Sequence, residues 1–132
     1  MLTEQDREEL REMTEVGWVE ACRARDWDAA VALLTEDVDY MAADLPLLKG
    51  REAVREFLAE FPELVDFHQN LVEAQGDTSL AVLRATFGGT FRVEEQEVTG
   101  VGKVLSTATK QDGSWHFAAV CWNWDAPPAL LV

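Results

Sequence analysis

Basic residues and long apolar runs are both scarce in this sequence. Its 132 residues hold 11 lysines and arginines against 25 aspartates and glutamates, which gives a formal net charge of -14 at pH 7. This charge repels nucleic-acid phosphates and anionic membrane surfaces, so we expect neither as a partner. No apolar run approaches the roughly 20 residues of a membrane span, and the N-terminus lacks the basic start and apolar core of a signal peptide. We therefore expect a cytoplasmic protein.

Cysteine and histidine are also rare, with two residues of each kind. Cys22 and Cys121 fit neither a disulfide framework nor the spacing of a zinc site, and free cysteine in a core behaves as a small hydrophobe. Two separate histidines do not make a metal site, and the many carboxylates show no calcium-loop spacing. We expect buried free thiols, no metal and no cofactor.

What the sequence does have is enough apolar material for one core, since 48% of its residues are hydrophobic. Length and composition predict one domain, residues 1–132. The spacing of the first part is mainly helical. A capping box at Thr3 begins a long helix to about residue 24, and Asp26 can cap a second, short helix that ends near residue 35. A short strand at 38–43 and a third helix between Gly50 and Pro62 follow.

After Pro62 the spacing becomes that of strands. Gly88 and Gly89 interrupt one of them and predict a bulge or sharp bend, hence a strongly curved sheet. Helices that precede an antiparallel sheet indicate an α+β domain, with the helices packed into the concave face. The connections are short enough for an antiparallel meander of four strands, 65–74, 80–92, 98–110 and 115–124.

The last of these strands is apolar on both faces. An Asp112-Gly113 turn precedes it, and it holds three of the five tryptophans. Strict alternation places Trp115 on one face and Trp122 with Trp124 on the other. The helices of one chain can cover only one face, so a strong bend or a partner subunit must cover the other. We expect a homodimer formed through the outer face of the sheet.

Several short segments carry a family pattern. Arg-Asp-Trp-Asp-Ala-Ala at 25–30, Leu-Leu-Thr-Glu-Asp-Val at 33–38 and Lys-Gly-Arg-Glu-Ala-Val-Arg-Glu-Phe at 49–57 are similar to the recurring pattern of the cone-shaped fold shared by nuclear transport factor 2, ketosteroid isomerase and the SnoaL-like polyketide cyclases. The segments 102–103, 112–115 and 122–127 resemble the small SnoaL-like proteins related to the ketosteroid isomerases. The resemblance implies this NTF2-like, or cystatin-like, fold over nearly the whole chain. It implies no single activity, because the fold hosts isomerases, dehydratases, cyclases, hydrolases and non-catalytic assembly modules.

The resemblance to ketosteroid isomerase implies a carboxylate base near the end of the first strand. Alignment through Glu36-Asp37 places Ala42 at that position instead. Asp44 follows two residues later with the same strand parity, so it could reach into the same cavity as a general acid or base. Alternatively, Asp44 caps or solvates the loop before Pro46.

His68 is the second candidate catalytic residue. Asp66 and His68 share one face of a strand and could form an orienting pair. The opposite face of that strand is apolar, so Asp66, His68 and Asn70 could instead face water.

Five residues are candidates for the lining of a cavity between the helices and the concave sheet: Trp18, Tyr40, Phe87, Lys103 and Asn123. Trp18 and Tyr40 could supply a hydrogen-bond donor or an aromatic wall. Lys103 lies in an otherwise apolar strand, where it is either an edge residue or a charge that projects into the cavity. The family resemblance favours the cavity.

Two functions fit this sequence. The first is the binding of a small hydrophobic molecule in the cavity, with cofactor-independent isomerases, cyclases or dehydratases as the catalytic form of such a pocket protein. The second is a non-catalytic, dimeric ligand-binding or assembly module of the same fold. The aromatic residues and isolated polar groups support the first function, and Ala42 at the expected position of the base supports the second.

Overall fold

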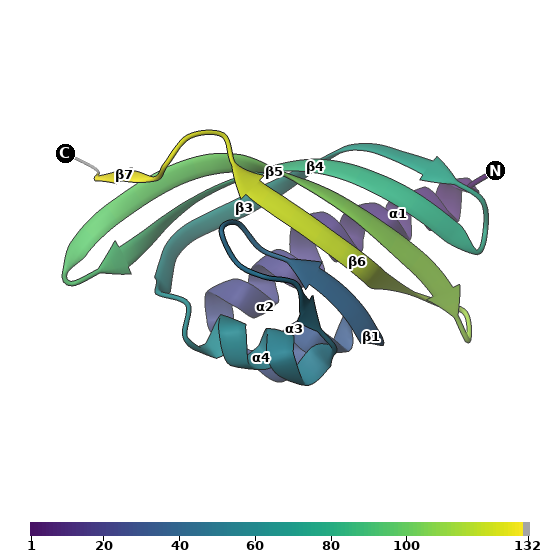
Figure 1. Ribbon diagram of the computed structural model, residues 1–132. Helices are drawn as coiled ribbons and strands as arrows, with labels where there is room; N and C mark the ends of the chain where they lie inside the picture. The colour runs from purple at the N-terminus through teal and green to yellow at the C-terminus, as the bar shows by residue number, and fades with distance from the viewer. Residues whose placement is uncertain (131–132) are drawn as a thin grey trace.

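The computed structural model describes residues 1–130 of the chain. One strongly curved sheet forms a layer, and the helices pack against its concave side (Figure 1). All helices precede the four long strands in the chain, and two further strands lie just before the last helix. This is the predicted α+β architecture, and the predicted packing of the helices into the concave face is confirmed.

The N-terminal helix has three parts, α1 (Glu4–Glu12), a π-helical turn η1 (Met13–Gly17) and α2 (Trp18–Ala24). The predicted capping box begins it: Thr3 Oγ1 accepts a hydrogen bond from Asp6 N–H at 3.0 Å, and the Asp6 carboxylate accepts one from Thr3 N–H at 3.1 Å. Helical spacing predicted one regular helix here. The π-helical turn departs from it and changes which side chains share a face, because its hydrogen bonds span five residues.

The second helix begins as predicted, since Asp26 Oδ1 accepts a hydrogen bond from Ala29 N–H at 3.1 Å. It ends earlier than predicted, and a short strand lies between residues 43 and 50, where no element was predicted. No helix within residues 1–130 is long and apolar enough to cross a membrane. The elements of this part are α3 (Trp27–Ala32), β1 (Leu34–Met41), β2 (Leu48–Lys49) and α4 (Arg51–Ala59).

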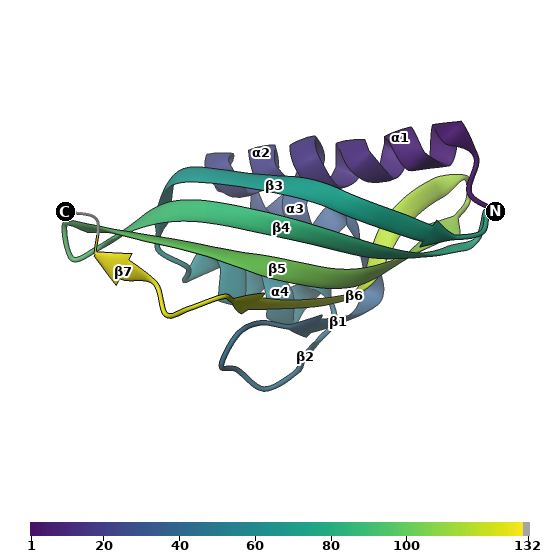
Figure 2. The same ribbon diagram turned by 90° about the horizontal axis from the view of Figure 1, so that it is seen from above.

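The remaining strands form the predicted antiparallel meander. They are β3 (Glu63–Gly76), β4 (Leu80–Val93), β5 (Gln96–Gln111), β6 (Ser114–Trp124) and the short β7 (Ala129–Leu130). The order in the sheet is β2-β1-β6-β5-β4-β3, with β7 paired to β5, and only the β1–β6 pair is parallel. Viewed from above, α1 and α2 lie along the β3 edge, and β1 with β2 forms the opposite edge (Figure 2).

A β-bulge in β6 corrects the alternation predicted for this strand. The register shifts between Thr107 and Ala108 of β5, which leaves Ala118 as the extra residue. Phe117 before the bulge and Val120 after it therefore face the same side, although strict alternation would separate them. The prediction that β6 is apolar on both faces is wrong, because the bulge turns most of its large side chains to the concave side.

The two glycines of β4 form no bulge. Gly88 and Gly89 keep a regular register with both neighbouring strands, and the register shifts beside β4 lie in β3. A Cβ at Gly88 would lie 2.7 Å from Cε1 of His68. The glycine therefore permits a close contact across the strands. Of the predicted bulge or sharp bend, the bulge is absent at these two residues, whereas the predicted strong curvature of the sheet is present (Figure 1).

The buried carboxylate of Asp6 joins the first helix to the sheet. Its Oδ1 accepts hydrogen bonds from Lys110 Nζ at 2.9 Å and from Trp115 Nε1 at 3.1 Å. The hydrogen bond from the Lys110 ammonium, opposed in part by burial, lowers the pKa of the Asp6 carboxyl far below its ordinary value. The ionised carboxylate thus fixes the start of α1 on β5 and β6.

Candidate ligand-binding site

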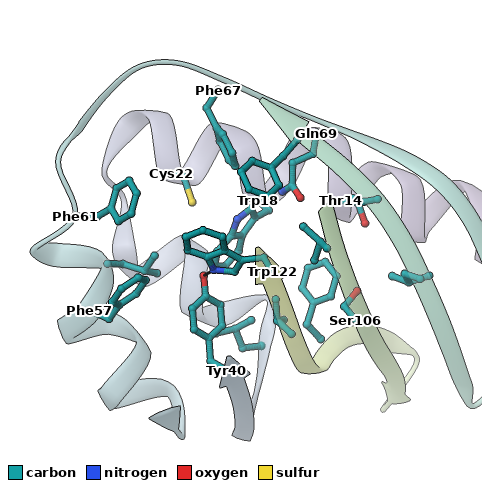
Figure 3. Close-up of a pocket in the computed structure, with 18 of the residues that line it drawn as sticks. Thr14, Trp18, Cys22, Tyr40, Phe57, Phe61, Phe67, Gln69, Ser106 and Trp122 are labelled. Atoms are coloured by element: carbon teal, nitrogen blue, oxygen red, sulfur yellow. Dashed lines mark hydrogen bonds between the residues drawn. The ribbon is translucent and has the colours of Figure 1, made fainter. Parts of the chain in front are cut away.

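A cavity of about 100 Å³ lies between the helices and the concave face of the sheet. This volume is several times what one water molecule needs. The wall takes side chains from the helices and from β1, β3, β4, β5 and β6 (Figure 3). Aromatic rings dominate it: Trp18, Trp27, Tyr40, Phe57, Phe61, Phe67, Phe87, Phe117 and Trp122.

Tyr40 has a smaller exposed fraction than Thr14, Cys22 or Ser106, the other buried polar residues of this wall. Tyr40 is 3% exposed, and its hydroxyl oxygen accepts a hydrogen bond from Trp122 Nε1 at 3.0 Å. The parallel pairing of β1 with β6 brings the two residues together, since Tyr40 pairs with Val120. Because the bond to Trp122 uses an acceptor site, the phenolic proton stays free to be donated to a ligand.

Burial keeps the ionisable groups of the cavity neutral. It raises the pKa of the Tyr40 phenol well above its ordinary value, and the nearby Cys22 adds to this effect. It also raises the pKa of the Cys22 thiol to about 12. Both side chains are therefore uncharged at neutral pH, and Tyr40 can donate a hydrogen bond without acting as an anion.

Phe87 anchors the aromatic part of the sheet face. Its ring contacts Trp122 and Trp124 edge-on, at centroid distances of 5.6 and 5.3 Å, and Phe67 at 6.4 Å. A Cβ at Gly102 would lie 2.5 Å from Cζ of Phe87, so only glycine on β5 leaves room for this ring. This packing fixes the sheet side of the wall, because the rings of Phe67, Trp122 and Trp124 each contact Phe87.

Three uncharged polar residues complete the lining: Thr14 from η1, Gln69 from β3 and Ser106 from β5. Thr14 is 4% exposed, and its Oγ1 has no hydrogen-bond partner among residues 1–130. Of the described residues that line the cavity, none is an aspartate, glutamate, histidine, lysine or arginine. Residues 1–130 also hold no group of three or more histidine, cysteine, aspartate or glutamate side chains suited to a metal ion.

The structure brings three of the five predicted binding residues together. Trp18, Tyr40 and Phe87 all line the cavity. The prediction that Lys103 projects into it is wrong, because Lys103 alternates with inward-facing residues of β5 and points to the outer face. There its Nζ lies 3.0 Å from the carboxylate of Asp125. Asn123, which pairs with Lys103 across the strands, is likewise exposed outside the cavity.

The two candidate catalytic residues lie outside the cavity. β1 ends at Met41, and Asp44 adopts a left-handed conformation with a φ of 62° in the turn that follows. The parity argument fails there because the strand has already ended, and the Asp44 side chain is exposed. His68 is exposed on the outer face of β3, over Gly88, so the structure does not bring it near Asp44 or the cavity.

The sequence interpretation missed the polar part of the lining. Thr14, Trp18 and Cys22 recur at a spacing of four residues, which places them on one helix face. That spacing is present in the sequence, but a helical period alone does not distinguish the wall of a cavity from an ordinary core face. Ser106 also interrupts an apolar strand, and Gln69 has the parity of Phe67 on β3; neither signal shows by itself that a cavity is present.

Residues 16–121 match the SnoaL-like domain family, which is most of the chain. No curated protein matches the chain.

Solved structures with the same fold come from several bacteria. A ketosteroid isomerase-like protein from Erwinia carotovora atroseptica SCRI1043 is 22% identical, with a TM-score of 0.76 over 85% of this chain and 91% of that one. An NTF2-like protein with a cystatin-like fold from Novosphingobium aromaticivorans is 18% identical, with a TM-score of 0.76 over 93% and 84%. A hexachlorocyclohexane dehydrochlorinase from Novosphingobium barchaimii LL02 is 12% identical, with a TM-score of 0.80 over 97% and 91%. At these identities the likeness shows the fold alone, and the predicted NTF2-like fold is confirmed.

Proposed function

The chain belongs to the SnoaL-like domain family, and we propose that it binds a small, neutral, hydrophobic molecule in the cavity. The observation that carries this proposal is the wall itself, in which aromatic rings surround a buried tyrosine hydroxyl with a proton to donate. Ligand pockets are commonly apolar with a few well-placed polar groups. This cavity has that composition.

The charge of the lining selects against ionic ligands. An ionised group that leaves water for an apolar cavity without a charged partner is strongly disfavoured. No charged side chain lines this cavity among the described residues, and Tyr40 and Cys22 are neutral. A carbonyl or ether oxygen suits the Tyr40 hydroxyl, because it accepts one hydrogen bond and carries no charge.

A matched pair of bicyclic probes tests the proposal. α-Tetralone and tetralin share a ring system and differ in one carbonyl group. Calorimetric titration should show that both bind and that α-tetralone binds about tenfold more tightly, as one buried hydrogen bond would give. In Tyr40→Phe this preference should fall to about twofold or less while tetralin binds as before.

The control for Tyr40→Phe is its thermal midpoint, because the substitution leaves Trp122 Nε1 without its acceptor. If the variant is folded and binds tetralin with unchanged affinity, the smaller preference for α-tetralone results from the missing hydroxyl. If neither probe binds the wild-type protein at millimolar concentration, the proposal is contradicted.

Acid–base catalysis on a carbonyl compound is a second candidate function, and the Tyr40 hydroxyl favours it, since such a donor could polarise the carbonyl. The reaction would also need a base, and Asp44 and His68 lie outside the cavity. We favour binding without catalysis. Exchange of the protons beside the α-tetralone carbonyl, followed by NMR in heavy water, should then be no faster with the protein than in buffer. Clear acceleration would support an enzyme.

We further propose that the protein forms a homodimer through the outer face of its sheet. Aliphatic side chains that alternate with the cavity-facing residues of β4 and β5 are exposed there: Leu80, Val82, Val101 and Leu105. Basic residues on this face are paired within the chain, as Arg84 is with Glu73 and Lys103 with Asp125. The face is therefore locally balanced, so two copies can approach despite the net charge of -14.

Light scattering at micromolar concentration should show a dimer, and Leu105→Asp should convert it to a monomer. Leu47→Asp is the matched control, because Leu47 is 55% exposed in a loop off the sheet face and Leu105 is 53% exposed. A wild-type monomer, or equal effects of the two substitutions, would contradict the proposed interface.

A further inference from the structure

Thr14 is a buried polar residue whose hydroxyl makes no hydrogen bond among residues 1–130. It is 4% exposed, and it lines the cavity. A threonine inside a regular helix can bond to a carbonyl one turn earlier. Thr14 makes no such bond. An orphaned buried hydroxyl lowers stability, so its presence in a cavity wall points to a group supplied from outside the chain.

The helix around Thr14 is also irregular. Thr14 is the second residue of the π-helical turn, in which Met13 O accepts a hydrogen bond from Trp18 N–H. Short π-helical turns occur frequently at functional sites. Here the turn places Thr14 and Trp18 together on the wall of the cavity.

Thr14 and Tyr40 lie toward opposite edges of the sheet. Glu15, which follows Thr14 in η1, accepts a hydrogen bond from Leu71 N–H of β3 at 2.7 Å, whereas Tyr40 belongs to β1, near the other edge. Figure 3 shows Thr14 to the right of Trp18 and Tyr40 below Trp122. The Thr14 hydroxyl can both donate and accept a hydrogen bond.

We infer that the Thr14 hydroxyl forms a second polar subsite, and that the ligand is a neutral hydroxyketone or ketoamide with its two polar groups at opposite ends of an apolar ring system. The inference rests on the proposed function, in which Tyr40 binds the carbonyl. It adds the requirement for a second polar group, which the Tyr40–Trp122 pair does not impose.

The chemistry of the subsite decides which second group fits. A hydroxyl side chain matches a partner that both donates and accepts, such as an alcohol or a carboxamide. A carboxylate would have no cation to pair with, because no lysine or arginine lines the described cavity. The ring system between the two ends would lie against the faces of Trp18 and Trp122.

The test compares α-tetralone with two derivatives that carry a hydroxymethyl or a carboxylate group at the far end of the aromatic ring. With the wild-type protein the hydroxymethyl compound should bind about tenfold more tightly than α-tetralone, and the carboxylate more weakly than both. Thr14→Val removes the hydroxyl and keeps the shape. It should abolish the advantage of the hydroxymethyl group and leave the affinity for α-tetralone within twofold.

Thr109→Val is the matched control, because Thr109 Oγ1 is also a buried hydroxyl without a partner but lies outside the cavity lining. It should change no affinity. Neither hydroxyl has a hydrogen-bond partner among residues 1–130, so both variants should melt at or above the wild-type midpoint. The melts thus separate binding effects from folding.

The outcomes distinguish the two claims. Binding of α-tetralone without any gain from the hydroxymethyl group, or an equal loss for both compounds in Thr14→Val, contradicts the second subsite and leaves the proposed function standing. Failure of all three compounds to bind contradicts the proposed function and this inference with it. Tighter binding of the carboxylate would contradict the neutral character of the subsite.

Discussion

Strand β6 supplies an indole N–H to each of two buried oxygens, and the two sites differ in what remains after that bond is made. Trp115 donates to the Asp6 carboxylate at 3.1 Å, and Trp122 donates to the Tyr40 hydroxyl at 3.0 Å. Asp6 also receives a hydrogen bond from the Lys110 ammonium, so its charge is neutralised within the chain. Tyr40 retains a proton that it can donate.

This difference shows how a buried polar group can be assigned either to the stability of the fold or to the binding of a ligand. At Asp6 the hydrogen bonds close between helix and sheet, and removing one partner would leave another unpaired. At the cavity, Tyr40 has spare capacity and Thr14 has no partner within residues 1–130. The first arrangement stabilises the fold. The second does not, and we therefore connect it with a ligand.

The largest expected effect is a loss of stability when the hydrogen bonds around Asp6 are disrupted. Asp6→Asn keeps the shape of the side chain and removes the charge that Lys110 pairs with, so the thermal midpoint should fall by roughly 5 °C or more. Asp39→Asn is the matched control, because it removes the partner of Lys49 in an ion pair exposed by 41% and 64%. Its effect in calorimetry should be within about 2 °C. Equal decreases in the thermal midpoint of the two variants would contradict a special stabilising role of Asp6.

At the cavity, the next largest effect should be a loss of ligand affinity. Trp18 lines the cavity and packs edge-on against Phe117 at a centroid distance of 6.4 Å. Trp18→Ala removes a large apolar surface from the wall, so the affinity for α-tetralone should fall by about 1–3 kcal/mol, which corresponds to roughly fivefold to 150-fold. Titration calorimetry measures the loss, and thermal melts of the same variant show how much of it comes from weaker packing. An unchanged affinity would place the ligand elsewhere.

A smaller effect should sharpen the assignment of Asp6. A carboxyl whose pKa is lower in the folded chain contributes stability above its unfolded pKa of about 4, and this contribution is lost as the pH falls below that value. The Lys110 ammonium gives Asp6 such a lowered pKa. The difference in midpoint between wild type and Asp6→Asn should therefore be constant from about pH 7 to pH 5 and shrink below about pH 4. A difference that stays constant in acid would contradict the ionised, paired carboxylate.

Much of the fold could be predicted from the sequence because it depends on local signals. The capping box at Thr3, the Asp26 cap and the Asp112-Gly113 turn act within a few residues, and the turn shows the positive φ angles of 52° and 82° that such a hairpin needs. Alternating apolar residues then located the four long strands. The short connections indicated the antiparallel meander. The parallel pairing of β1 with β6 joins segments that are distant in the chain, and no local signal contains it.

The site could be predicted only in part, because it depends on where regular structure is interrupted. The extra residue Ala118 changes the parity of β6, so Phe117 and Val120 share a face that alternation denies them. Asp44 shows the opposite case, in which a residue was predicted to face the cavity and does not. The prediction assumed strand alternation at Asp44, but β1 ends at Met41. Thr14 depends on a π-helical turn. Single-residue irregularities of this kind leave no periodic signal.

The smallest expected effect concerns Asp44. Its carboxylate is exposed in the turn after β1, outside the cavity lining, and asparagine tolerates the left-handed conformation that the φ of 62° requires. Asp44→Asn should therefore change the α-tetralone affinity by less than twofold and leave the thermal midpoint in place, as calorimetry and melting curves would show. A fivefold or greater loss of affinity would mean that this turn folds over the bound molecule. Asp44 would then return as a candidate acid or base, and the assignment of the cavity to binding alone would fall.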